Sequence, residues 1–518
     1  MNAKLLFDLL NATRGWLGHW RTHHFVFLAA LQIFQTNPSG KVFSPTSFQA
    51  ESKTGGIQEA IDAASKVGGG RVQIPAGTFI LHASPGQPAI VLRSSVSLEG
   101  AGPDNTILKL EANSRVQPAV MVNQDYTNPD AAEPDHDITL QGFTVDVAAS
   151  QQILQDTALA RDIPVAGEQN LVFQSKEGIA RDSLLLIDPG PNEEIVPILS
   201  ESAGNFRAFF MHPHARGARV EELVGRLHGL ALVGIRNLRM QDVTVRNVPM
   251  DGVYLTSTID GKPHRTYCEK ISIQRCNFIA CHRNGISIID AEDVAIASNK
   301  FRDIIGDPGG PVDVEPNTPE EHGARIAITR NDVSRCYRGI MVFLPLSAPK
   351  PENFKDEEII GNSIDGTLYG WGLSVVRQRA GALVADNSIS GAAGDGIVLI
   401  GSSGVQVKDN IIADPGRCHT VGNCPTKQAT AAGIRIADGS SSSNRSVGNT
   451  ATGNIVTGNK ITDHQQPPTM QYGIDFSSIG GGNTIVGNVV SGFDPKHGAA
   501  LHVSAEARSN IISNNSTQ

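Results

Sequence analysis

The amino-acid sequence predicts an all-β protein built as a parallel β-solenoid, and three observations support this prediction. The chain has 518 residues, of which only 18% are charged and 5% are aromatic, whereas glycine is abundant at 53 residues. From about residue 238 onward, short apolar strands led by glycine recur at spacings of 24 to 40 residues, and turns with asparagine lie between them. No helical periodicity interrupts these repeats. Repeats of this length that carry short strands indicate coils stacked in a solenoid.

Residues 1–45 are expected to be a leader or a disordered N-terminal segment. Basic and titratable residues at 21–24 precede the apolar run Phe25–Phe34, which has the length of a signal-peptide core. The run is too short to cross a membrane. We therefore expect a secreted or extracellular protein without a membrane span.

Residues 46–149 are expected to form the N-terminal cap and the first coils. Apolar residues at Ile57, Ala60, Ile61, Ala64 and Val67 have the spacing of one amphipathic helix face. This helix is expected to cover the open apolar end of the solenoid. The segments 71–81 and 96–110 each predict two strands around a turn.

Residues 150–222 break the pattern and predict a small inserted β domain. The segments Asp182–Leu199 and Phe206–Met211 look like its strands, and the polar runs 151–156 and 221–225 bound it. Insertions of this kind are tolerated in loops because loop closure costs little more as a loop lengthens. The role of the insertion is open between substrate contact and decoration.

Residues 223–518 are expected to form the main coils, from two sets of repeated positions. In one set a glycine or proline starts a short apolar strand; in the other a β-branched residue precedes Asn by three positions. Asn tolerates the left-handed conformation of a sharp turn, and stacked Asn side chains form hydrogen-bonded ladders. The strand starts are Gly252, Gly285, Pro311, Gly339, Gly372, Gly396, Gly433 and Gly473, and the Asn positions are 299, 331, 362, 387, 410, 459, 488 and 514.

The opening helix, the I-P-A-G-T-F strand pair and the Asn-turn coils resemble the right-handed parallel β-helix proteins of the pectate-lyase-like superfamily. The resemblance covers roughly residues 46–149 and 223–518. It implies a right-handed parallel β-helix. It does not define the reaction, because that superfamily includes polysaccharide lyases, glycoside hydrolases, epimerases and phage tailspikes.

The candidate catalytic residues lie in the run G-G-P-V-D-V-E-P-N at positions 309–317. Strand alternation directs Val312 and Val314 to one side, and Asp313 and Glu315 to the other, exposed side. Two neighbouring carboxyl groups separate their pKa values, so that one can act as an acid and the other as a base or nucleophile at a glycosidic bond. Asp251, two coils earlier, is a candidate third acid.

Six residues near these acids are candidates for substrate binding. Trp371 offers an aromatic plate for a sugar ring, and His282 is a candidate proton-transfer group that is otherwise a structural turn residue. Arg338 and Arg377 are suited to bind sugar hydroxyl or uronate carboxylate groups, or else they form ion pairs with acids at the surface. The full set is Trp371, Arg338, Asn284, His282, Arg377 and Tyr254.

Two other functions stay open beside glycoside hydrolysis. One is a calcium-assisted polysaccharide lyase acting on a uronate polymer, with Ca²⁺ held near the acids at 303, 307, 313 and 315. The other is a non-catalytic carbohydrate-binding or adhesive solenoid. The pectate-lyase patterns W-I-D-H and R-x-P-x-x-R and the polygalacturonase patterns N-T-D, G-H-G and R-I-K are absent. The run E-P-D-H-D at 133–137 is similar to the D-P-H-D of alginate epimerases, but its position before the insertion indicates coincidence.

Charge and cysteine usage limit the partners. The net charge of −9 argues against nucleic-acid binding, so we expect a polysaccharide partner. Cys418 and Cys424 bracket a short polar loop that a disulfide would close in an oxidising compartment. No C-x-x-C pair supports zinc, and no cofactor is expected for a hydrolase. The sequence does not define an oligomeric state.

Overall fold

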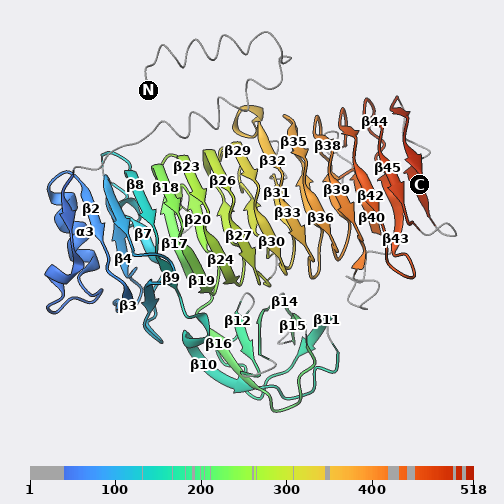
Figure 1. Cartoon of the computed structure of the whole chain (residues 1–518). Coiled ribbons are helices and arrows are strands. Elements are labelled where there is room, and N and C mark those ends of the chain that lie inside the picture. Colours follow the sequence, from blue (N-terminus) through green and yellow to red (C-terminus); the bar gives the residue numbers. More distant parts are fainter. Residues whose placement is uncertain are drawn as a thin grey trace, which may run out of the picture.

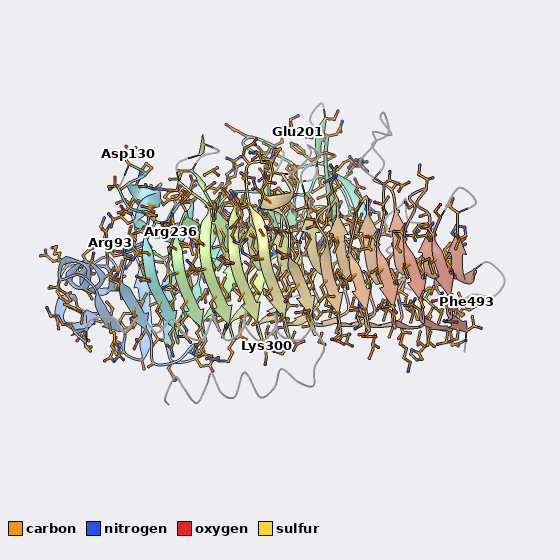
Figure 2. The ribbon with its side chains drawn as sticks, turned by 90° about the horizontal axis from the view of Figure 1, so that it is seen from above. Arg93, Asp130, Glu201, Arg236, Lys300 and Phe493 are labelled. Atoms are coloured by element: carbon orange, nitrogen blue, oxygen red, sulfur yellow. The ribbon has the colours of Figure 1, made fainter. Side chains whose placement is uncertain are left out.

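A computed structural model of the chain describes residues 40–517, except for 131, 166, 181–182, 190–192, 199, 203–204, 211, 260–261, 264, 307–308, 345–349, 418–430, 440–449, 494–497 and 505–508. The fold is a right-handed parallel β-helix, as the sequence predicts. Figure 1 shows its coils stacked in sequence order, from helix α3 (Ile57–Lys66) at one end to strands β43–β45 near the other. Seen from above, the strands lie side by side from the end marked by Arg93 to the end marked by Phe493 (Figure 2).

Three long sheets, here called A, B and C, form the walls of the solenoid, and within each sheet successive coils pair in parallel. Sheet A contains, in order, β1 (Val42–Phe43), β2 (Gly70–Gln73), β5 (Val96–Glu99), β8 (His136–Gln141), β18 (Arg236–Gln241), β23 (Cys268–Gln274), β26 (Ala291–Ala297), β29 (Gly323–Thr329), β32 (Glu357–Ile360), β35 (Ala382–Ala385), β38 (Gln406–Lys408), β41 (Ile455–Thr457), β44 (Thr484–Val486) and β47 (Ile511–Ser513).

Sheets B and C follow sheet A around each coil. Sheet B contains β3 (Gly77–Leu81), β6 (Thr106–Leu110), β9 (Thr144–Asp146), β19 (Thr244–Val248), β24 (Asn277–Cys281), β27 (Lys300–Arg302), β30 (Asp332–Ser334), β33 (Ser363–Asp365), β36 (Ser388–Ser390), β39 (Ile411–Ala413), β42 (Lys460–Thr462), β45 (Val489–Ser491) and β48 (Ser516–Thr517). Sheet C contains β4 (Ile90–Leu92), β7 (Ala119–Asn123), β17 (His228–Val233), β20 (Val253–Thr256), β25 (Ile286–Ile288), β28 (Val312–Val314), β31 (Ile340–Phe343), β34 (Leu373–Val376), β37 (Ile397–Ile400), β40 (Ala431–Ala437), β43 (Met470–Phe476) and β46 (Ala499–Val503).

Each coil therefore has three strands, where the sequence pattern indicated two. The segments 71–81 and 96–110 contain the sheet B strands β3 and β6, as predicted, but the repeat pattern after residue 238 missed the later strands of this sheet, many of which are only three residues long, such as β27 (Lys300–Arg302). In β27 a single buried residue, Phe301, lies between two exposed basic residues. A strand of this length contains too few alternations to produce a recognisable period.

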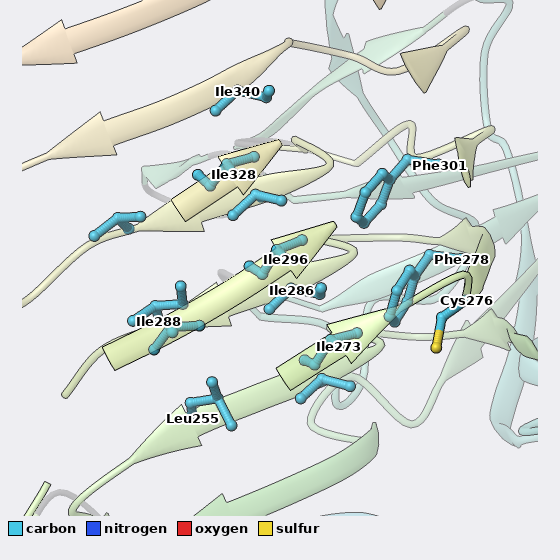
Figure 3. Close-up of a cluster of buried hydrophobic side chains, with 14 of the residues drawn as sticks. Leu255, Ile273, Cys276, Phe278, Ile286, Ile288, Ile296, Phe301, Ile328 and Ile340 are labelled. Carbon is cyan, nitrogen blue, oxygen red and sulfur yellow. The ribbon is translucent and has the colours of Figure 1, made fainter. Parts of the chain in front are cut away.

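The core is one continuous column of apolar side chains inside the coils. Each strand of a coil contributes inward residues, such as Ile296 from sheet A, Phe301 from sheet B and Ile288 from sheet C. Figure 3 shows equivalent residues of neighbouring coils lying above one another. Phe278 and Phe301 stack with ring centroids 5.0 Å apart. Burial of these stacked residues drives the coils together.

A ladder of buried asparagines closes the turn between sheets A and B. In Asn331, for example, the side-chain amide donates to the Ile296 carbonyl and to Oδ1 of Asn362. The ladder confirms seven of the predicted asparagines as stacked residues. The expected left-handed conformation instead belongs to the residue before each of them, such as Arg330 with φ 52°. The last prediction is wrong, because the final ladder member is Asn515 and not Asn514. Asn514 has φ 55°, which is the left-handed position immediately before the ladder residue. The ladder runs through Asn299, Asn331, Asn362, Asn387, Asn410, Asn459, Asn488 and Asn515.

The recurring glycines stand where two coils approach closely at the start of sheet C. A Cβ on Gly285 would lie 2.5 Å from the Pro311 carbonyl oxygen and 2.6 Å from the Phe301 ring. A Cβ on Gly339 would lie 1.6 Å from the Gly372 carbonyl oxygen. The glycine column therefore sets the distance between successive strands of sheet C.

Helix α3 caps the first coil as predicted. Its residues Ile57, Ala60, Ile61 and Ala64 are fully buried, but Val67 is the exposed C-cap and does not belong to this face. Strand β1 begins inside the range assigned to the leader and pairs with β2. The 3-10 helix η2 (Pro45–Phe48) follows it; the other short helices are α4 (Gln124–Thr127), η3 (Ala149–Gln151) and η4 (Pro351–Asn353).

The small inserted β domain has two antiparallel sheets and its own apolar core. One sheet contains β10 (Ile153–Ala158), β16 (Arg219–Leu223), β12 (Leu184–Ile187) and β13 (Glu194–Pro197); the other contains β11 (Gly167–Leu171), β15 (Asn205–Phe210) and β14 (Ser200–Ser202). The polar runs taken as its boundaries lie largely in β10 and β16, which pair with each other from Ile153↔Leu223 onward. This pairing closes the insertion at its base.

The inserted domain lies beside the middle coils (Figure 1). The ring of Phe209, in β15, contacts the rings of Tyr337 and Tyr369, with centroid distances of 5.8 Å and 4.7 Å. These tyrosines lie in the turns that lead into β31 and β34 of sheet C. A short hairpin of β21 (Thr258–Ile259) and β22 (Lys262–Pro263) lies in the connection from β20 of sheet C to β23 of sheet A.

Candidate functional site

The acidic strand β28 occupies the middle of sheet C. Val312 and Val314 are fully buried in the core, as predicted, and Asp313 points outward between Ser287 and Met341 of the neighbouring strands. The expectation that both acids lie on an exposed face is wrong for Asp313, which is only 2% exposed. Side chains of the neighbouring coils, such as Asn284 and Met341, surround this carboxyl, and a single-strand pattern cannot reveal such neighbours.

Asp313 is a buried carboxyl group with one hydrogen-bonded oxygen. The Asn284 side-chain amide donates to Oδ2 over 3.2 Å, whereas Oδ1 has no hydrogen-bond partner within the described part of the chain. Burial raises the pKa of Asp313 well above its usual value; the nearby charge of Glu315 acts in the same direction, and that of Arg283 opposes it. The group is therefore suited to hold a proton and to donate it.

Asp251 is also buried, at 0% exposure, but its environment favours the charged form. Arg283 Nε and the Asn284 backbone N–H donate to Oδ1 over 2.9 Å and 3.0 Å, and His228 Nδ1 lies 3.3 Å from Oδ2. Burial by itself would raise the pKa of Asp251, but Arg283 and His228 outweigh it, so that the pKa is lowered. Two buried acids in one network thus have pKa values shifted in opposite directions.

Two residues of this network, His228 and Arg283, were not among the predicted site residues. The His228 ring stacks on Tyr254, with centroids 4.8 Å apart, and the Arg283 guanidinium lies 5.9 Å from the Tyr254 centroid. Burial raises the pKa of Tyr254 and keeps its phenol protonated. His228 precedes Gly229, one coil before the first glycine that the repeat analysis counted, so extending that column backward would have found it.

Glu315 lies at the edge of this network and is half-buried. Its backbone N–H donates to the Ile288 carbonyl, and its carboxylate is close enough to Asp313 and Arg377 to affect their pKa values. Arg377 Nε donates to the Leu344 carbonyl over 2.7 Å. Burial and the nearby Arg379 lower the pKa of Arg377, and Glu315 opposes this shift.

The other predicted binding residues surround the acids at different distances. Trp371 and Arg338 are half-buried and lie in the turns before β34 and β31; Trp371 stacks loosely on Phe343, with centroids 6.4 Å apart. Arg338 lies over the Tyr337 ring at 5.8 Å. The His282 ring forms no hydrogen bond to the described residues, and burial lowers its pKa to about 4. His282 is therefore a neutral, buried group that the structure does not join to Asp313.

The described acids among those considered for calcium, at 303, 313 and 315, do not gather around one point. Asp303 forms an ion pair with Arg335 at 2.6 Å on sheet B's side, away from β28, and Asp307 lies outside the described residues. Within the described ranges no group of three or more His, Cys, Asp or Glu side chains is placed to hold a metal ion. Cys418 and Cys424 lie outside the described residues; the four described cysteines are buried and free.

Asp135, in the run E-P-D-H-D, has a structural role. Asp135 is buried and accepts hydrogen bonds from Asn123 Nδ2 and the Asp125 backbone N–H. His136 and Asp137 begin β8 in sheet A, whereas Asp313 is in sheet C. Asp135 therefore holds the α4 turn in place.

Comparison with known proteins agrees with this architecture. Residues 264–518 match the sequence family described as "Right handed beta helix region". The chain is a right-handed parallel β-helix protein.

Among curated proteins, the chain is similar to mannuronan C5-epimerases of Azotobacter vinelandii. It is 39% identical to Mannuronan C5-epimerase AlgE4 over 88 residues, which are 17% of this chain and 16% of the epimerase. The match to AlgE3 of the same organism is 38% identical over 88 residues, 17% of this chain and 5% of that protein. The chain thus matches only a small part of each relative's length.

Two solved structures share the fold over most of this chain. The A-module of Azotobacter vinelandii mannuronan C-5 epimerase AlgE6 covers 92% of this chain and 99% of its own, with a TM-score of 0.51 and 16% identity. The N-terminal fragment of the bacteriophage Phi29 gene product 12 covers 96% and 68%, with a TM-score of 0.54 and 14% identity. At these identities the likeness concerns the fold. No helix in the described residues is long and apolar enough to cross a membrane.

Proposed function

We propose that this protein is a carbohydrate-active enzyme that cleaves a polysaccharide by glycoside hydrolysis on the outer face of sheet C. Asp313 is the proton donor to the leaving oxygen, and Glu315 is the general base or nucleophile. The observation that carries the proposal is the buried carboxyl of Asp313 on β28, whose pKa is raised by burial and by the charge of Glu315, the residue that follows the strand. The charge of Glu315 is close enough to act on Asp313, as in the carboxyl pairs with which glycosidases place an acid beside a base or nucleophile.

The surrounding residues support this assignment in distinct roles. Asn284 orients Asp313 through a hydrogen bond to Oδ2, and Oδ1 is buried without a partner among the described residues. Ionised Asp251 and Arg283 form a fixed charge pair behind it, with a 2.9 Å contact. Tyr254, whose ring lies 5.9 Å from the Arg283 guanidinium, and Glu315 are both half-buried. Preorganised charges of this kind stabilise the charge that develops on a sugar in the transition state.

A second candidate is proton abstraction next to the carboxylate of a uronate polymer, the step that lyases and C5-epimerases share. The local similarity to mannuronan C5-epimerases favours a uronate substrate. Arg283, whose side chain is 29% exposed, would then neutralise the uronate carboxylate, in place of or beside the Ca²⁺ of a calcium-assisted lyase. Either reaction on a polysaccharide is consistent with an enzyme that acts outside the cell.

The test is a screen of the purified full-length protein against alginate, polygalacturonate and neutral β-glucans. Hydrolysis produces reducing ends without an unsaturated product, whereas a lyase produces ultraviolet absorbance from the new double bond. Epimerisation changes the uronate composition without shortening the chain. Glycan binding without any of these changes would support the adhesive alternative and contradict the proposal.

A further inference from the structure

A second buried charged cluster lies on the same face of sheet C, nearer the C-terminal end. Its core is an alternating chain of charges: Arg435 Nε lies 2.8 Å from Oδ2 of Asp395, and another guanidinium nitrogen contacts Asp475. His502 Nδ1 lies 2.8 Å from Asp475 Oδ1. The Tyr472 ring stacks on His502, with centroids 4.6 Å apart and planes inclined by 20°. We call Asp395, Arg435, Tyr472, Asp475 and His502 the C-terminal cluster.

The C-terminal cluster repeats the residue types found around Asp251. There, His228 stacks on Tyr254 at 4.8 Å and 23°, while Asp251 contacts both His228 and Arg283. The two arrangements are not copies of one coil, because the histidine and the tyrosine exchange positions. His228 precedes its glycine and Tyr254 follows one, whereas Tyr472 precedes Gly473 and His502 pairs with Asp475. The same set of residue types thus occurs twice on sheet C, at different positions relative to the glycine column.

Residues of both clusters, the one around Asp251 and the C-terminal cluster, lie in the same column of outward-facing positions as Asp313. Strand pairing carries this column from Asp313 through Met341, Ser374 and Val398 to Arg435, Asp475 and His502. Asp313 and Asp475 are five strand spacings apart, roughly 24 Å at about 4.8 Å per spacing. Tyr254 lies two spacings from Asp313 in the other direction, roughly 10 Å away.

A contribution to the stability of the fold does not by itself explain the C-terminal cluster. Asp395 and Asp475 have side chains only 1% and 4% exposed, and desolvating such charges costs as much as their attraction returns. Val398, in the same column, shows that an apolar residue is accommodated there at 0% exposure. In contrast, the His502 side chain is 42% exposed. The buried charges therefore hold one accessible aromatic plate in a fixed orientation.

We propose that the C-terminal cluster is a second saccharide-binding site, which holds a distal part of the polysaccharide whose scissile bond lies at Asp313; this inference rests on the proposed function. The apolar face of a sugar ring packs on the exposed imidazole face. Nδ1 of His502 is bonded to Asp475, so Nε2 is the ring nitrogen that donates a hydrogen bond to a sugar hydroxyl or accepts one from it. A polymer held at both clusters passes over Asp313 between them.

The test measures saccharide binding by calorimetry to the full-length Asp313→Asn protein, which avoids turnover. The ligands are alginate, polygalacturonate and β-glucan oligosaccharides of about 10 Å and about 30 Å, which span two and six strand spacings. We expect His502→Ala to weaken binding of the long ligand about tenfold and to leave the short ligand unchanged. His502→Phe, which keeps the plate, should restore most of the long-ligand affinity.

The matched control is His464→Ala. His464 is also paired with an aspartate, with Nδ1 3.1 Å from Asp414, but its side chain is 68% exposed and it belongs to neither cluster. Unchanged long-ligand binding in His502→Ala, or an equal loss for both lengths together with a lower melting temperature, would overturn the second site. Length-dependent binding without any hydrolysis by the wild type would instead contradict the proposed function and leave the second site standing.

Discussion

The side-chain amide of Asn284 donates a hydrogen bond to Oδ2 of Asp313 over 3.2 Å, from the neighbouring coil of sheet C. The same amide nitrogen lies 3.0 Å from Ser287 Oγ, and Asn284 Oδ1 accepts from the Gly310 backbone N–H. Asn284 is fully buried, so its orientation is fixed by these three partners. It therefore leaves Asp313 one defined rotamer and one oxygen without a partner.

Asp313→Asn is expected to lower the rate of polysaccharide cleavage by at least about a hundredfold, because the amide cannot donate a catalytic proton. The protein should keep its melting temperature, since burial already favours the uncharged acid and the amide is also uncharged. Initial rates and thermal unfolding check both statements. Ser374→Ala, in the same outward column two strands later, is the control and should retain activity. Full activity of Asp313→Asn would remove this residue from the mechanism.

Glu357 predicts a pH dependence of stability. It is 1% exposed, and burial raises its pKa to about 8, although Gln378 donates to one of its oxygens. The folded state thus binds a proton that the unfolded state releases near pH 4.5. The free energy of unfolding should therefore fall between pH 4.5 and about 8, by up to about 1.4 kcal/mol per pH unit from this group.

Denaturant unfolding of wild type and Glu357→Gln at several pH values checks this effect. The variant should lose most of the decline above pH 4.5, because its amide does not ionise. Glu358→Gln, the half-buried neighbour on the same strand, is the control and should follow the wild type. Identical pH profiles of wild type and Glu357→Gln would contradict the expectation.

Asn362→Ala is expected to destabilise the coils by about 3 kcal/mol or more, because it leaves several buried polar groups unpaired. Asn362 donates to the Ile328 carbonyl and accepts from both the backbone and the side chain of Asn331. Asn515→Ala removes the partly exposed end of the same ladder, where water can replace the lost partners, and should cost less. Chemical unfolding of both variants compares the two costs, and equal costs would argue against burial as the cause.

Phe209→Ala is expected to loosen the inserted domain from the coils without unfolding it, because Phe209 supplies ring contacts to Tyr337 and Tyr369. Phe210, the next residue, is fully buried in the core of the insertion, and Phe210→Ala should destabilise the insertion itself. Hydrogen exchange distinguishes the two variants. Phe209→Ala should increase exchange mainly in the turns around residues 337 and 369, and protection there equal to wild type would contradict the contact's importance.

The repeated features of the fold were predictable from the sequence because each is local and recurs. A glycine such as Gly285 reports a close approach between coils, and an asparagine such as Asn331 reports a buried turn, whatever surrounds them. In the first coils the sheet B strands β3 and β6 were predicted, but in the repeats after residue 238 the strands of this sheet were missed, because most have only three residues and carry no period. The last ladder asparagine was misplaced by one position because Asn514 and Asn515 are adjacent.

The site was predictable only in part. The direction of Asp313 follows from strand alternation, but its burial depends on side chains of the neighbouring coils, such as Asn284 and Met341. The contact of His228 with Asp251 likewise joins residues from successive coils, and only the exact register places them together. Register is a property of the stacked coils, so no single strand contains it.

The asparagine ladder also has an evolutionary consequence. Asn362 and Asn387 occupy equivalent positions 25 residues apart, with the side chain of one bonded to the next. Removal of residues 362–386 would join Gly361 directly to Asn387 and offer Asn331 the same kind of partner as before. The solenoid can therefore gain or lose whole turns by duplication or deletion of such units, which changes the length of its outer face in fixed steps of one turn.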